Sequence, residues 1–111
     1  MDIYKVNITE PVEYDIRGIV DYIMYTFDMP NTAIDFENRF KKAITSLSEM
    51  PEKYPPVLDL KGYRKIIVKN YIIFFRVDNI NKIVTVDRVL HSSQNWLDIL
   101  QSEESPCLTI S

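Results

Sequence analysis

The fold is decided by one stretch of the sequence, Tyr63-Arg64-Lys65-Ile66-Ile67-Val68-Lys69-Asn70-Tyr71-Ile72-Ile73-Phe74-Phe75-Arg76-Val77-Asp78. It is rich in the β-branched and aromatic residues that strands favour, and Asn70 in its middle tolerates the geometry of a tight turn. A third run of the same kind covers residues 82–91, after a break at residues 79–81. The pattern predicts three strands, at residues 63–69, 71–78 and 82–91, that form an antiparallel meander.

The residues before this stretch predict one strand and a first helix. Residues 3–8 alternate apolar with polar or amphipathic side chains, as a half-buried strand does. Thr9 can cap a helix that begins at about Glu10, and apolar residues recur along it with the 3.6-residue period of one helical face. We expect this helix to end at residues 28–30.

A second helix is expected only a few residues later. Asn31 or Thr32 can cap it, the same apolar period continues along it, and Pro51 stops it. Because the connection between the two helices is short, they should lie antiparallel as a hairpin. Their apolar stripes then face one common surface, which must be the sheet.

The remaining segments complete the expected architecture. Residues 51–62, with their prolines, indicate an ordered loop, and residues 95–101 indicate a short final helix. Residues 102–111 are expected to form a polar C-terminal tail. The sequence therefore predicts a single α+β domain over residues 1–101, in the order β-α-α-β-β-β and a short final helix, with a helical hairpin packed on a small, mainly antiparallel sheet.

The composition fits one small domain that needs neither a metal nor a cofactor. A chain of 111 residues with 46% hydrophobic residues can bury one core. The only cysteine, Cys107, cannot form an intramolecular disulfide. One cysteine and one histidine are too few ligands for a structural zinc site. Two glycines, Gly18 and Gly62, are too few for the Gly-rich loops that bind nucleotides. We expect no metal and no cofactor.

No segment has the pattern of an export signal or a membrane span. The N-terminus lacks the basic start and apolar run of a secretory signal, and no stretch approaches the ~20 apolar residues that cross a bilayer. Together with the lone cysteine, this favours a protein of the reducing cytoplasm without a membrane partner.

Charge is distributed unevenly along the chain, whose net charge is −3. Residues 1–60 carry six Lys/Arg and eleven Asp/Glu. Residues 92–111 carry no Lys/Arg and three Asp/Glu. Residues 61–91, which hold the predicted meander, carry seven Lys/Arg and two Asp/Glu. Such a basic segment either attracts phosphate or an acidic partner locally, or is an ordinary solvated face.

The order of elements and several short patterns resemble toxins of the RelE/ParE family. Residues 63–78 look like the family's second and third sheet strands, and Arg88-Val89-Leu90-His91 resembles the end of its fourth strand. Trp96 stands where similar chains resume a helix. The resemblance spans about residues 3–100. The pattern of the second helix is also similar, with Pro30, Ala33, Phe36, Phe40, Ile44 and Leu47 followed by Pro51.

The resemblance implies the toxin of a type II toxin–antitoxin system, which inhibits growth until a cognate antitoxin covers the sheet face and the helical hairpin. Members that resemble RelE cleave messenger RNA on the ribosome, whereas members that resemble ParE inhibit DNA gyrase and are not nucleases. The fold does not separate the two mechanisms. The basic strands and the histidine favour an endoribonuclease. The alternatives are a gyrase inhibitor and a decayed toxin that only binds its antitoxin.

RNA cleavage needs a general base, a general acid and cations around one phosphate. His91, the only histidine, can exchange a proton near neutral pH, although a lone histidine that closes a strand can also be structural. Arginines suit bidentate phosphate contacts and pair equally well with helix carboxylates. The catalytic candidates are Arg64, Arg76 and His91. The candidates for binding phosphate or the target are Lys65, Lys69, Tyr71 and Arg88.

Strand alternation limits how these candidates combine. Along residues 82–91 it places Thr85, Asp87 and His91 on one face of the sheet and Arg88 on the other. Arg88 is then expected to pair with a helix carboxylate such as Asp21 or Glu37. Asp87 on the His91 face would repel phosphate unless it is paired. The other helix carboxylates, Asp15 and Asp35, are expected to face water.

Aromatic residues supply the remaining expectations. Phe74 and Phe75 point to opposite faces of the sheet, so one should lie in the core and the other on a surface where an antitoxin or target binds. Tyr63 and Tyr71 can stack on bases or close a sheet edge over the core. The helix aromatics Phe27, Phe36 and Phe40 are expected in the core.

Overall fold

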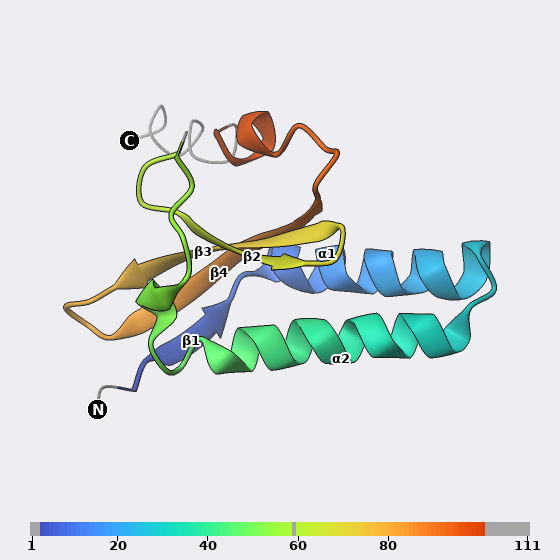
Figure 1. The fold of residues 1–111 in the computed structure, drawn as a ribbon, viewed down its shortest axis with the longest axis horizontal. Coiled ribbons are helices and arrows are strands. Elements are labelled where there is room, and N and C mark those ends of the chain that lie inside the picture. The colour runs from blue at the N-terminus through green and yellow to red at the C-terminus, as the bar shows by residue number, and fades with distance from the viewer. Residues whose placement is uncertain (1–2, 59, 102–111) are drawn as a thin grey trace.

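A computed structural model describes residues 3–58 and 60–101 of the chain (Figure 1). It confirms the predicted α+β architecture, and residues 96–101 are helical as expected. The predicted tail at residues 102–111 lies outside the described residues. The elements are β1 (Lys5–Ile8), α1 (Glu10–Asp21), the π-helix η1 (Tyr22–Thr26), α2 (Pro30–Ser46), the 3-10 helix η2 (Pro51–Lys53), β2 (Arg64–Val68), β3 (Tyr71–Asp78) and β4 (Ile83–His91).

The four strands form one mixed sheet in the order β1-β4-β3-β2. β2, β3 and β4 pair antiparallel, which confirms the predicted meander, and β1 adds a parallel pair at the β4 edge. Figure 1 shows α1 and α2 side by side on one face of this sheet, while the helix at residues 96–101 lies over the opposite face. The sheet is therefore the middle layer of three.

Each face of the sheet carries its own core. On the helix face, Phe40 of α2 packs with Phe75 and the inward-facing valines of β4. On the opposite face, Phe74 packs with Tyr63, Leu100 and Trp96. Both Phe74 and Phe75 are fully buried. The expectation that one of them faces a partner is wrong, because the helix at residues 96–101 covers the second face together with Val57, Leu60 and Tyr63.

Two details of the helical hairpin differ from the sequence prediction. Helix α2 begins at Pro30 with Met29 at the N-cap, so neither Asn31 nor Thr32 caps it. Proline is well suited to the first helical position because its missing N–H would have no helical partner there. Phe27 is 56% exposed instead of buried, because the connection between the helices lies beyond the end of the sheet (Figure 1).

A β-bulge in β4 changes which residues share a face. Phe74 pairs with Arg88 and Phe75 pairs with Val86, so Asp87 is an extra residue in β4. Beyond this bulge the alternation restarts one residue later. His91 consequently lies on the helix face, opposite Asp87. The predicted common face of Asp87 and His91 is wrong.

The bulge also marks the point where β1 stops covering the edge of β4. The parallel register ends at Ile8 and Val86. Beyond it, Asp15 of α1 accepts hydrogen bonds from the Val89 N–H at 3.0 Å and from Arg88 Nε and Nη2 at 2.8 and 2.9 Å. The side chains of Arg88 and Asp15 are only 19% and 13% exposed.

This contact corrects two expectations. Arg88 does pair with a helix carboxylate, but the partner is Asp15 and not Asp21 or Glu37. Asp15 does not face water, because α1 runs along the open edge of β4 and turns this carboxylate toward it. Thr9 occupies the predicted N-cap position of α1, but its hydroxyl donates to the Asp87 carbonyl at 3.0 Å and accepts no hydrogen bond from the first N–H groups of the helix.

We predict that Asp15→Ala lowers the free energy of unfolding by about 2–3 kcal/mol, because it leaves a largely buried guanidinium and a strand N–H without their acceptor. Urea denaturation of the purified variant measures this change. The matched control is Asp35→Ala, which removes an exposed carboxylate paired with Arg39 within α2 and should cost less than about 0.5 kcal/mol. Equal losses in the two variants would contradict the structural role given to Asp15.

Candidate functional site

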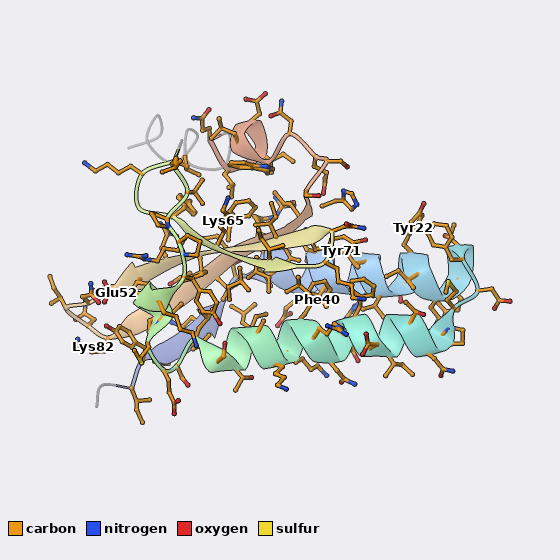
Figure 2. All side chains as sticks on the ribbon, viewed as in Figure 1. Tyr22, Phe40, Glu52, Lys65, Tyr71 and Lys82 are labelled. Atoms are coloured by element: carbon orange, nitrogen blue, oxygen red, sulfur yellow. The ribbon has the colours of Figure 1, made fainter. Side chains whose placement is uncertain are left out.

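The ends of β3 and β4 bring together Tyr71 and the only histidine. Tyr71 and His91 are cross-strand partners, and their rings meet edge to face with centroids 5.1 Å apart. The Tyr71 ring also contacts Phe36 and Phe40 of α2, at 5.6 and 5.8 Å between centroids. Figure 2 shows Tyr71 at this end of the sheet, between the strands and the helical hairpin. We call Phe36, Phe40, Tyr71 and His91 the aromatic corner.

The environment of Tyr71 favours its neutral form. Burial raises the pKa of Tyr71 above its ordinary value, and the neighbouring Tyr22 hydroxyl raises this pKa further by charge repulsion when both ionise. Because this pKa lies above its ordinary value, the Tyr71 hydroxyl is protonated at neutral pH, and the side chain is only partly buried.

The orientation of His91 is fixed by the residues that follow it. Its Nδ1 accepts a hydrogen bond from the Ser93 N–H at 3.0 Å and lies 2.6 Å from the Ser93 hydroxyl. The His91 N–H donates to Gln94 Oε1 at 2.8 Å. Because Nδ1 accepts from a backbone N–H, the neutral ring carries its hydrogen on Nε2. Nε2 is then the nitrogen available to a ligand or a partner.

Lys69 lies at the same end of the sheet. It is an exposed residue of the turn between β2 and β3 and has a positive φ of 54°. The next residue, Asn70, accepts a hydrogen bond from the Ser92 N–H at 2.8 Å, which ties this turn to the segment after His91. The structure therefore places Lys69, Tyr71 and His91 at one end of the molecule.

Arg64 and Lys65 lie elsewhere. Arg64 Nη1 donates to the backbone carbonyls of Tyr54 and Glu52, at 2.6 and 3.3 Å, which holds the guanidinium against η2. Arg64 pairs with Phe75, four residues along β3 from Tyr71, which corresponds to roughly 13 Å. Lys65 is the next residue along β2 and points to the opposite face.

Arg76 and Arg88 are engaged by carboxylates. Arg76 Nε and Nη2 each donate to one oxygen of Asp87 at 2.8 Å, and its guanidinium stacks over the Tyr63 ring at 5.5 Å. Asp87 is thus paired, which was the condition for accepting a carboxylate near a phosphate site. The same pairing offsets the charge of Arg76, as Asp15 offsets that of Arg88.

The candidates therefore divide into two sets. Lys69, Tyr71 and His91 are close to one another, whereas Arg64, Arg76 and Arg88 are separated from them and engaged individually. Their roles in binding or catalysis stay predictions. Ser93 and Tyr22 were not among the predicted site residues, and only the position of Ser93 two residues after the histidine could have suggested its contact.

Within residues 3–58 and 60–101, no group of three or more His, Cys, Asp or Glu side chains is arranged to hold a metal ion. No helix among these residues is long and apolar enough to cross a membrane.

Residues 6–96 match the family model of the ParE toxin of the type II toxin–antitoxin system parDE. The chain belongs to this family. This confirms the resemblance to RelE/ParE toxins and makes the chain a ParE-family toxin. No curated protein matches its sequence.

Solved structures of related toxins share the fold. The chromosomal ParDE system of P. aeruginosa aligns with a TM-score of 0.66 and 16% identity, over 80% of this toxin and 96% of that chain. A RelBE toxin–antitoxin complex of Mycobacterium tuberculosis aligns with a TM-score of 0.60 and 20% identity, over 80% of this toxin and 98% of that chain. A double mutant of the E. coli toxin RelE in the free state has a TM-score of 0.58 and 16% identity, over 82% of this toxin and 85% of that chain. Both branches of the family thus have this architecture.

We predict that neutral His91 is the Nε2–H tautomer in the folded toxin, because Ser93 occupies Nδ1. Nitrogen-15 NMR of the imidazole ring should show Nδ1 without a hydrogen and Nε2 with one. A neutral ring with its hydrogen on Nδ1 would show that the Ser93 contact does not form in solution.

We predict that the toxin loses stability as the pH rises above about 10, the ordinary pKa of tyrosine, partly through Tyr71. Its raised folded pKa means that the unfolded chain ionises first, so the contribution is fully present below this pH and lost above it. Urea denaturation at about pH 9 and about pH 11 should show a smaller fall in Tyr71→Phe than in the wild type. An equal fall in both would contradict the assignment to Tyr71.

Proposed function

We propose that this toxin arrests growth by binding a protein target, DNA gyrase being the target that its family resemblance implies, and that it does not cleave RNA. The observation that carries the proposal is the state of its arginines. Arg76 and Arg88 are each paired with a carboxylate, and backbone carbonyls hold Arg64. RNA cleavage needs cations that converge on one phosphate with an acid and a base. These three guanidinium groups do not converge.

The exposed tip of the helical hairpin also supports a protein target. Tyr22 and Phe27 contact each other edge to face at 5.1 Å, yet both are about half exposed. Tyr25 and Met29 beside them are exposed as well. Aromatic and methionine side chains are enriched at protein–protein interfaces, where they act as anchors. We propose that this tip contacts the target.

A cognate antitoxin is the second partner that we propose, with both proteins in the cytoplasm. Several solved relatives are toxin–antitoxin complexes, including the RelBE complex of M. tuberculosis. In this toxin, a groove of about 730 Å³ between α1 and α2 has apolar residues such as Ile16, Val20 and Ile44 and is flanked by charged residues. An amphipathic segment of the antitoxin fits a groove of this composition.

Ribosome-dependent messenger-RNA cleavage is the second candidate function. The aromatic corner and the nearby Lys69 favour it, because Tyr71 can donate a proton, His91 presents Nε2 and Lys69 supplies a cation at the same end of the sheet. This reaction would use Lys69 and not the three arginines to offset charge on the phosphate.

The two candidates are separated by induced expression of three forms in growing cells: the wild type, Lys69→Ala/His91→Ala, and Tyr25→Ser/Phe27→Ser. Growth, messenger-RNA 5′ ends and DNA damage are followed together. We expect Lys69→Ala/His91→Ala, the corner variant, to arrest growth like the wild type while messenger RNA stays intact. Tyr25→Ser/Phe27→Ser, the tip variant, should inhibit purified gyrase at least about tenfold less well than the wild type.

Cuts in messenger RNA that disappear in the corner variant would replace this proposal with the nuclease. Absence of growth arrest with all three forms, when each is produced in folded form, would leave a decayed toxin that only binds its antitoxin.

A further inference from the structure

Strand β2 is an edge of the sheet, and only its first part is covered. The Tyr63 carbonyl accepts the Val57 N–H at 2.8 Å, and the Lys65 N–H donates to the Pro55 carbonyl at 3.2 Å. These bonds show that residues 63 and 65 turn their backbone groups outward, away from β3. By the alternation of an antiparallel ladder, Ile67 does the same.

Residues 55–57 cover the first part of β2, and this cover stops at Pro55. Pro55 has no N–H with which to return a bond to the Lys65 carbonyl, and the chain before it turns away into η2. Within residues 3–58 and 60–101, no backbone group hydrogen-bonds to the outward N–H and carbonyl of Ile67. The second half of β2 therefore offers open donors and acceptors to an added strand.

The side chains along this open edge are apolar and basic. Ile67 is 64% exposed, and Lys65 and Lys69 stand on either side of it along the chain. Residues 61–77 contain five Lys/Arg and no Asp/Glu. Neither lysine forms an ion pair with a described residue, in contrast to Arg76 and Arg88.

We propose that the open edge of β2 binds an extended acidic segment of a partner polypeptide as an additional strand. The backbone pattern selects an extended peptide, because only a peptide presents alternating N–H and carbonyl groups at this spacing. The two lysines select acidic side chains. A second copy of the toxin does not fit, since antiparallel pairing centred on Ile67 would place Lys65 opposite Lys69 of the other copy. This inference does not depend on the toxin's cellular target.

The test uses the full-length toxin, labelled with nitrogen-15, and a blocked peptide of about eight residues that alternates glutamate and valine, the length of an ordinary strand. We expect the amide signal of Ile67 to shift on titration and its hydrogen exchange to slow. Ile67→Pro should abolish binding without unfolding the toxin, because that N–H makes no bond to β3. Thermal melting of this variant verifies its fold.

Charge variants and a second peptide complete the design. Lys65→Gln/Lys69→Gln should weaken binding about fivefold, whereas Lys5→Gln/Lys42→Gln, which removes two exposed lysines elsewhere, should not. A peptide that alternates glutamate and proline cannot add a strand and should not bind at Ile67. The proposal is overturned if the Ile67 amide does not respond, if both peptides or both charge variants behave alike, or if the toxin self-associates through this edge.

Discussion

The one extra residue in β4, Asp87, determines the faces of all residues that follow it in the strand. Without the bulge, Val89 would follow Asp87 to the outer face, and a charged side chain would enter the helix-face core at position 88. With it, Val84, Val86 and Val89 all pack against the helices. The apolar pattern of the strand and the single hydrophobic face of the hairpin are compatible only because the ladder skips one residue.

The bulge also determines where charge is available. It places Asp87 beside Arg76 and turns Arg88 toward the edge of β4, where Asp15 accepts it. The segment that carries an excess of cations in the sequence is therefore partly neutralised, by Asp87 within the segment and by Asp15 from α1. Its basic character is expressed chiefly at β2 and the following turn, where Lys65 and Lys69 make no ion pair with the described residues.

Local signals were sufficient to predict the order of the strands and helices from the sequence, but not the π-helix Tyr22–Thr26 that follows α1. The limits of β3, residues 71–78, agree with the prediction because Asn70 and the polar break after Asp78 interrupt a continuous apolar run. The start of α1 at Glu10 agrees because Pro11 and the acidic first turn are local features. Asp15 was misjudged because its burial depends on where β1 stops covering β4, and helix periodicity carries no information about that register. The bulge was missed for the same reason.

The candidate site shows the same division between local and long-range information. The sequence identified His91, Tyr71 and Lys69 by residue type, but it could not show that the sheet gathers these three and separates them from the arginines. That separation bears directly on mechanism. A nuclease needs cations free to move onto a phosphate, and a guanidinium already held by two hydrogen bonds to a carboxylate must first give up that pairing. A protein inhibitor needs no such rearrangement, since its exposed aromatic residues are available without breaking any contact of the core.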